Sequence, residues 1–285
     1  MHEDHVGAGA DEHRDDPAQC EVDVGVLGPA EIRGAAAPFE RAWSLELVVY
    51  LVMHPRGATS DEWATALWPD RLMASPTLYS IASAARRALG RSRSGADHLP
   101  RRHGRLQLSP TVGSDWQRLR VLAAGPTTDD WERALSLVRG RPFEGLRAPD
   151  WTVLEGVVAE MEEGVVDLAL RLAEHRLGAG DGRRAAWAAR RGLLASPYDE
   201  RLYRILLRAA DLEGNPAGVE AAMAELVLLV AGGDSGYLVT GVRTPVSNHH
   251  LAQRAIDLVH PDTAALYRAL SRRRTAASGR VVARL

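Results

Sequence analysis

Arginine side chains are concentrated in one stretch of the sequence, residues 86–105. This stretch holds one acidic residue, Asp97, and seven arginines: Arg86, Arg87, Arg91, Arg93, Arg101, Arg102 and Arg105. The chain as a whole has a net charge of −2, so the positive surplus is local. Guanidinium groups pair with phosphate oxygens and with guanine edges, but an arginine-rich loop can also be ordinary solvated surface. The coincidence of this stretch with a predicted helix and the hairpin that follows it favours a nucleic-acid surface.

The complete absence of lysine restricts the chemistry open to the chain, because all 35 basic residues are arginine. No P-loop lysine and no Schiff-base lysine is available. The sequence also shows no paired carboxylates, no nucleophile triad and no glycine-rich cofactor loop. We therefore expect a protein that is not an enzyme, with no catalytic residue, no cofactor and no metal site.

Length and composition indicate two ordinary globular domains in 285 residues. A single cysteine, Cys20, cannot form an internal disulfide or a thiolate cluster for zinc. The N-terminal residues lack the basic and apolar regions of a secretory signal, and no apolar run is long enough to span a membrane. We expect a cytoplasmic protein with no membrane partner.

The first half of the chain alternates short strand patterns with helical patterns. Valines at 22, 24 and 26 alternate with polar residues and predict a strand, which Gly28-Pro29 turns into a hairpin. Helical spacing predicts helices over 41–53, 59–68 and 75–89, the second with Thr59 and Glu62 as a capping box. A second hairpin is expected over 99–108. A strand pair, three helices and a hairpin are typical of a winged helix.

The third predicted helix has two unequal faces. Leu78, Ile81, Ala82, Ala85 and Leu89 fall in one apolar stripe, whereas Ser80, Ser83 and Arg87 point the other way. On the outward stripe, arginine can pair with guanine and serine with either base type, while arginines of the hairpin can contact phosphates. The predicted DNA-binding residues are Ser80, Ser83, Arg86, Arg87, Arg91, Arg101, Arg102 and Arg105.

An internal repeat marks the second half. Gly180-Asp181 and Gly214-Asn215 are 34 residues apart, the period of a tetratricopeptide (TPR) helix pair. The same offset superposes Leu168 on Leu202 and Leu172 on Leu206. We expect antiparallel helix pairs without β-sheet from about Asp129 to Val230, with a groove that binds a protein or a small regulator.

These patterns predict a mostly α protein, a winged helix followed by an all-α TPR-like domain. We expect a disordered acidic tail over 1–21, the winged-helix DNA-binding domain over 22–114, the TPR-like domain over 126–274 and a flexible C-terminal tail over 275–285.

Several segments resemble the Streptomyces antibiotic regulatory protein (SARP) family, in which a winged helix precedes a bacterial transcriptional activator domain. The most specific of them is the Leu67-Trp68-Pro69-Asp70 ending of the second helix. The segments that carry the resemblance are Val26–Ile32, Thr59–Asp70, Ile81–Gly90, Trp151 with Leu154-Glu155, Ser196–Glu200, and Pro261–Thr263 with Leu266-Tyr267.

The resemblance implies a transcriptional activator whose partners are double-stranded DNA and RNA polymerase, with a homodimer as a further expectation. The chain departs from the family at two places. The wing reads Gly104-Arg105-Leu106-Gln107-Leu108 where the family usually ends Gly-Tyr-x-Leu, and the segment 231–260 is longer than expected, as an insertion with its own role would be. The altered wing and the modest outward face of the third helix keep an alternative open. The alternative is a protein-interaction or ligand-sensing scaffold whose winged helix no longer binds DNA.

Overall fold

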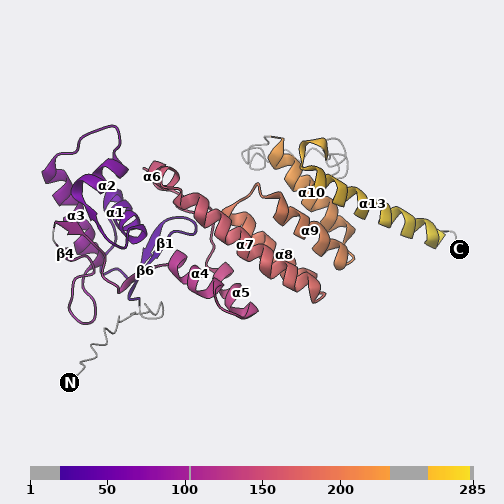
Figure 1. Ribbon diagram of the computed structural model, residues 1–285, viewed down its shortest axis with the longest axis horizontal. Coiled ribbons are helices and arrows are strands. Elements are labelled where there is room, and N and C mark those ends of the chain that lie inside the picture. Colours follow the sequence, from indigo (N-terminus) through magenta and orange to yellow (C-terminus); the bar gives the residue numbers. More distant parts are fainter. Residues whose placement is uncertain (1–19, 103, 232–255, 283–285) are drawn as a thin grey trace, which may run out of the picture.

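The computed structural model describes residues 20–102, 104–231 and 256–282. The molecule is elongated, with a small mixed α/β unit at one end and a row of helices extending from it (Figure 1). This confirms the predicted fold class, a winged helix followed by an all-α TPR-like array.

The N-terminal unit contains a three-stranded sheet in the order β2-β1-β6. Strand β1 (Val22–Gly25) pairs antiparallel with β2 (Glu31–Arg33), as the predicted hairpin requires, and Val24 lies opposite Ile32. Strand β6 (Val112–Ser114) pairs with β1 in parallel. The sequence pattern did not predict β6, because three residues with one apolar side chain carry no detectable alternation.

Three helices form the core of this unit: α1 (Ala42–Met53), α2 (Ser60–Leu67) and α3 (Ser75–Leu89). The predicted capping box of α2 is present, with Thr59 accepting from the Glu62 N–H and Glu62 accepting from the Thr59 N–H. Helix α3 begins at Ser75, the residue predicted to be its cap. Ala74 takes the N-cap position and offers no side-chain hydrogen bond.

The wing is a second small sheet in the order β3-β5-β4. Strands β4 (Arg101–Arg102) and β5 (Arg105–Leu106) form the predicted hairpin. Strand β3 (Ala58–Thr59), immediately before α2, pairs with β5. The wing is therefore attached at its base to the start of α2.

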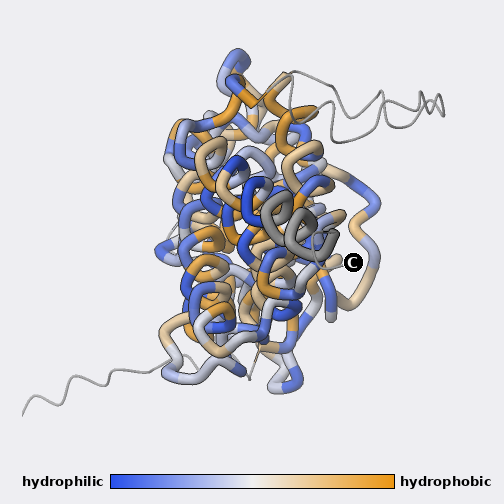
Figure 2. The backbone as a smooth tube through the Cα atoms, turned by 90° about the vertical axis from the view of Figure 1, so that its right-hand side faces the viewer, coloured by the Kyte–Doolittle hydropathy of each residue, from blue (hydrophilic) through white to orange (hydrophobic). Residues whose placement is uncertain are grey.

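The remaining chain is helical. Its elements are α4 (Asp115–Ala123), α5 (Thr128–Ser136), α6 (Asp150–Leu154), α7 (Val157–Gly178), α8 (Gly182–Ala195), α9 (Glu200–Leu212), α10 (Pro216–Val230), the 3-10 helix η2 (Ile256–Leu258) and α13 (Pro261–Val282). Figure 2 shows hydrophilic and hydrophobic residues alternating along these helices, as amphipathic packing requires.

The 34-residue repeat corresponds to two helix pairs, α7–α8 and α9–α10. Gly180 and Gly214 end the first helix of each pair with positive φ angles of 77° and 61°, where glycine is favoured. Asp181 and Asn215 then cap the second helix. No strand occurs among residues 129–230, all of which the structure describes, so the prediction of helix pairs without β-sheet is confirmed.

Two buried carboxylates join the winged helix to the helical array. Asp115, the first residue of α4, accepts from the backbone N–H groups of residues 26–27 after β1, at 2.8 and 3.1 Å. Glu46 on α1 accepts from the N–H groups of residues 147–148, at 2.9 and 3.1 Å. Burial raises the pKa of both carboxyl groups, against hydrogen bonds that lower it. The two units therefore meet through a bonded interface.

The ends of the chain differ from the expected tails where the structure describes them. The Glu21 N–H donates to the Thr111 carbonyl, and the Glu21 carboxylate accepts from the Arg93 N–H, so this residue joins the winged helix. Residues 1–19 of the expected acidic tail lie outside the described residues. At the other end, α13 continues to Val282, beyond the expected boundary at 274.

Candidate nucleic-acid interface

Helix α3 presents the predicted outward stripe on the face away from the core. Leu78, Ile81 and Ala85 on its inner face are buried. On the opposite face Arg87 is exposed, while Ser80 and Ser83 are half-buried. The structure thus brings the three predicted base-reading residues together on one accessible face of a fifteen-residue helix.

Two residues near this stripe escaped the sequence prediction. Tyr79 lies on α3 with 66% of its surface exposed, beside the stripe. Arg41, at the start of α1, donates from Nη1 to the Ser80 hydroxyl at 2.6 Å. An aromatic residue outside the apolar stripe of the third predicted helix was a signal for Tyr79. Arg41 lies 39 residues from Ser80, and no sequence pattern connects them.

Arg86 has a structural contact within the winged helix. Its Nε donates to the Leu99 carbonyl at 2.9 Å, and its Nη2 is buried without a hydrogen-bond partner. Burial, followed by the nearby charge of Arg101, lowers the pKa of Arg86. The side chain therefore holds α3 against the segment that leads into the wing. Little of the Arg86 guanidinium is therefore accessible for the predicted contact with DNA.

The wing arginines differ in how far their charges are neutralised. Arg101 in β4 is exposed. Arg102 lies in the same strand, but its side chain falls outside the described residues. Arg105 pairs with Glu62 at 2.9 Å and donates to the Gly57 carbonyl at 2.7 Å. Arg105 therefore ties the base of the wing to the start of α2, with its charge compensated.

Glu62, the partner of Arg105, is held ionised by several donors. The pKa of its carboxyl is lowered, first by the Thr59 N–H of the capping box and also by Arg105. Arg91, another predicted DNA-binding residue, is likewise paired, with its Nε 3.0 Å from an Asp97 carboxylate oxygen. It remains 71% exposed, so it could exchange this partner for a phosphate.

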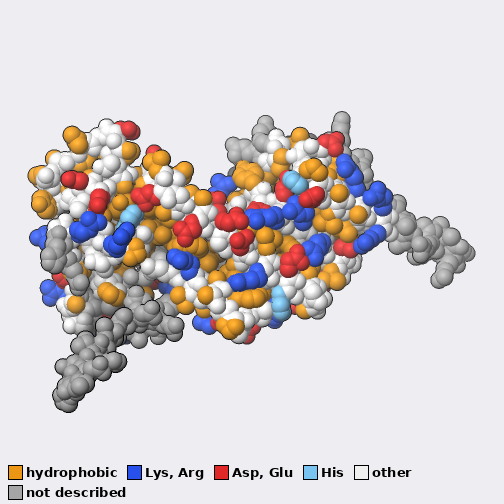
Figure 3. Space-filling model, in the orientation of Figure 1, with side chains coloured by type: hydrophobic (Ala, Val, Ile, Leu, Met, Phe, Trp, Pro, Cys, Tyr) orange, Lys and Arg blue, Asp and Glu red, His pale blue; other side chains and the backbone are white. Residues whose placement is uncertain are grey.

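Accessible arginines are present at the end of the molecule that carries α3 and the wing. Figure 3 shows arginine side chains along the edge that α3 and β4 occupy in Figure 1. Arg87 and Arg101 combine exposure with the absence of an ion pair among the described residues, in contrast to Arg91 and Arg105. The arrangement offers a helix stripe for a groove and cations on its flank for phosphates.

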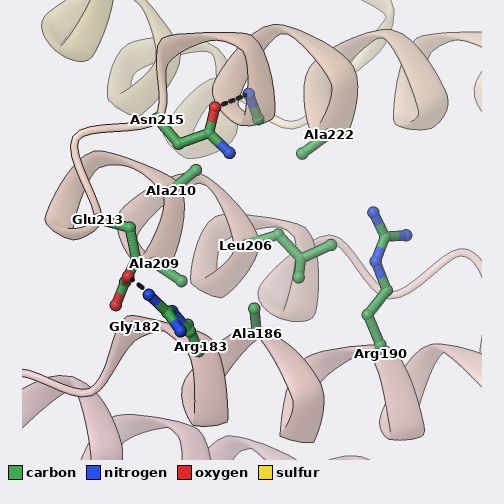
Figure 4. Close-up of a pocket in the computed structure, with 11 residues that line it drawn as sticks. Gly182, Arg183, Ala186, Arg190, Leu206, Ala209, Ala210, Glu213, Asn215 and Ala222 are labelled. Atoms are coloured by element: carbon green, nitrogen blue, oxygen red, sulfur yellow. Dashed lines mark hydrogen bonds and ion pairs between the residues drawn. The ribbon is translucent and has the colours of Figure 1, made fainter.

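The helical array carries a pocket of about 420 Å³ between α8, α9 and α10 (Figure 4). Small side chains such as Ala186 and Ala222 leave this space, with Leu206 on one wall. Arg183 at the edge pairs with Glu213 at 3.3 Å. The pocket is open and mixed in polarity, and its predicted use as a regulator-binding groove stays a prediction.

The described parts of the chain contain neither a membrane-spanning helix nor a metal site. No helix there is long and apolar enough to cross a membrane. No group of three or more His, Cys, Asp or Glu side chains is arranged to hold a metal ion within those same residues.

Comparison with known proteins supports the second half most directly. Residues 118–226 match the family described as "Bacterial transcriptional activator domain". Among solved structures, the chain is similar to Mycobacterium tuberculosis EmbR in complex with a low affinity phosphopeptide, with a TM-score of 0.52 and 20% identity. That match covers 90% of this chain and 71% of the EmbR chain, and at this identity it shows the fold alone. No curated protein sequence matches the chain.

Proposed function

We propose that this chain activates transcription by binding promoter DNA. The premise is its domain order, a winged helix followed by a bacterial transcriptional activator domain, which is the domain order of SARP-type regulators. The observation that carries the proposal is the outward Ser80–Ser83–Arg87 stripe of α3, with Arg87 exposed and the serines half-buried, flanked by the free charge of Arg101. A regulator that acts on promoter DNA works in the cytoplasm and does not require catalysis.

The two parts of the surface have different tasks in this proposal. Helix α3 enters the major groove, where Arg87 can donate two hydrogen bonds to guanine and the serines contact neighbouring bases. Arg101, and Arg102 from the sequence prediction, contact phosphates and supply affinity without sequence information. Arg91 contributes where a phosphate replaces Asp97. Arg86 and Arg105 support the surface by holding the wing in place.

The experiment is a DNA-binding titration of the full chain. A duplex is first enriched from a random pool by the wild-type protein, and binding is followed by fluorescence anisotropy at several salt concentrations. Arg87→Ala should cost roughly 1–3 kcal/mol on the enriched duplex and little on unrelated DNA. Arg101→Ala should weaken both duplexes alike and reduce the salt slope by about one phosphate contact.

Arg133→Ala is the matched control for these variants. Arg133 is an arginine of α5 with 70% of its side chain exposed, 3.6 Å from an Asp130 carboxylate oxygen, and its loss removes one arginine charge away from α3. Binding should match the wild type. Equal losses for Arg87→Ala on every duplex would contradict its base-reading role.

The helical array supplies the regulatory contact in this proposal, with RNA polymerase as the partner that activation requires. Purified RNA polymerase should be retained by the full chain on promoter DNA, and transcription from that DNA should rise in a reconstituted assay. Dimer formation is tested on the same sample by sedimentation. A chain that binds DNA but neither retains polymerase nor raises transcription would contradict activation.

A second function is favoured by the partly neutralised wing and by the pocket in the array. Arg105 is paired with Glu62, and the pocket of about 420 Å³ has the size of a small-ligand site. These features suit a ligand-sensing or protein-interaction scaffold whose winged helix no longer binds DNA. If the wild-type chain enriches no duplex from the random pool, this second function takes the place of the first.

A further inference from the structure

Arg41 is held in a defined position at the start of α1. Its carbonyl oxygen accepts from the Ser44 N–H at 2.9 Å and from the Ser44 hydroxyl at 2.6 Å. Ser44 is 1% exposed, so this anchor is part of the core. The backbone of Arg41 is thus fixed, while its side chain is on the surface.

The side chain of Arg41 reaches across to α3. Its Nη1 donates to the Ser80 hydroxyl oxygen at 2.6 Å, on the stripe that faces away from the core. No ion pair joins Arg41 to a carboxylate in the described part of the chain, whereas Arg91 and Arg105 are both paired. Arg41 therefore brings an uncompensated positive charge to the edge of the stripe.

We propose that Arg41 is a DNA-contacting residue that also sets the hydrogen-bonding role of Ser80. The inference rests on the proposed DNA-binding function. A duplex that receives α3 in its major groove places its phosphates beside the helix, where the remaining N–H groups of Arg41 can donate to an oxygen. One nitrogen holds Ser80 and the others are available for the phosphate.

The contact with Arg41 also restricts what Ser80 can recognise. A hydroxyl has one proton and two lone pairs, and in Ser80 one lone pair is occupied by Arg41. The proton is directed away from the guanidinium and is free to donate. Ser80 therefore favours base edges that accept, namely guanine N7 or O6, adenine N7 or thymine O4.

Three variants separate the charge of Arg41 from its hydrogen bond. The full chain and the duplex enriched by the wild-type protein are used, with anisotropy titrations over a range of salt concentrations. Arg41→Ala should weaken binding about tenfold. It should also lower the salt slope by about 0.9, the value for one phosphate.

Arg41→Lys keeps the positive charge, so the salt slope should stay at the wild-type value. Ser80→Ala should leave the slope unchanged and relax the preference at one base pair of the enriched site. Arg133→Ala, with the loss of one arginine charge away from α3, should leave both quantities unchanged.

The outcomes distinguish this inference from the proposed function. If Arg41→Ala binds with wild-type affinity and slope while Arg87→Ala loses binding, Arg41 does not touch DNA, and the proposed function stands. If Arg41→Ala keeps the base preference of the wild type, the hydrogen bond to Ser80 has no role in recognition. If the wild-type chain binds no duplex, both proposals fail. Thermal unfolding checks that each variant is folded.

Discussion

Replacement of Asp115 by alanine should strongly destabilise the junction between the two halves of the molecule. Asp115 is 1% exposed and is the first residue of α4, directly after β6. One carboxylate oxygen accepts from the Val26 N–H at 2.8 Å. The other accepts from the Leu27 N–H at 3.1 Å and from Arg139 Nη2 at 3.3 Å.

The magnitude follows from the groups that alanine would leave without partners. Two buried backbone N–H groups would each lose their acceptor, at about 1–3 kcal/mol per group. Arg139 would keep its ion pair with Glu31 at 3.0 Å, so the loss of its contact with Asp115 adds little to the cost. We expect Asp115→Ala to lower the free energy of unfolding by about 3–5 kcal/mol, a large part of a typical total.

Asparagine at the same position should be milder. Burial raises the pKa of Asp115, so the folded protein disfavours the charged form relative to the neutral one. An asparagine side chain resembles the neutral form and keeps an oxygen for the Val26 N–H. We expect a loss of about 1–2 kcal/mol, from the second amide that remains without an acceptor.

Urea unfolding followed by tryptophan fluorescence and by circular dichroism measures both losses. The two probes also show whether the two halves unfold together. The reasoning is refuted if Asp115→Ala stays within about 1 kcal/mol of the wild type, or if asparagine costs as much as alanine.

Three further predictions concern the pH dependence of stability, the helix pairs and the wing. Burial raises the pKa of the Glu46 carboxyl group. Its contribution to stability is therefore fully present below the ordinary pKa and is lost as the pH rises through the pKa of the folded state. In urea titrations, the stability advantage of the wild type over Glu46→Gln should shrink from acidic to neutral pH. A Cβ at Gly192 would lie 2.6 Å from a leucine side chain of α9, so Gly192→Ala should lower the free energy of unfolding by about 1–3 kcal/mol through overcrowding. A Cβ at Gly180 would meet nothing within 4 Å, so Gly180→Ala should cost about 1 kcal/mol, from its positive φ alone. Similar thermal shifts for both variants would argue against the close contact of α8 with α9. Arg86→Ala should release the segment at Leu99 and speed hydrogen exchange in the wing, and unchanged exchange rates there would mean that Arg86 does not hold it.

Local patterns were sufficient for most elements of this fold. The capping box at Thr59, the apolar stripe of α3 and the glycine turns at Gly180 and Gly214 are properties of neighbouring residues, and each is present in the structure. Helix periodicity and turn chemistry act over a few residues, so sequence spacing alone determines them. The stripe with Ser80, Ser83 and Arg87 was predictable for the same reason.

The contacts that combine these elements were decided by the tertiary structure. The parallel pairing of β6 with β1, the carboxylate of Asp115 beneath the end of β1, and the reach of Arg41 to Ser80 each join residues far apart in the chain. The tertiary structure also decides which arginines keep a free charge and which are paired with a carboxylate far away in the sequence, as Arg105 is with Glu62. A hydrogen bond depends on distances of a few ångströms between side chains, and the packing of whole helices sets those distances.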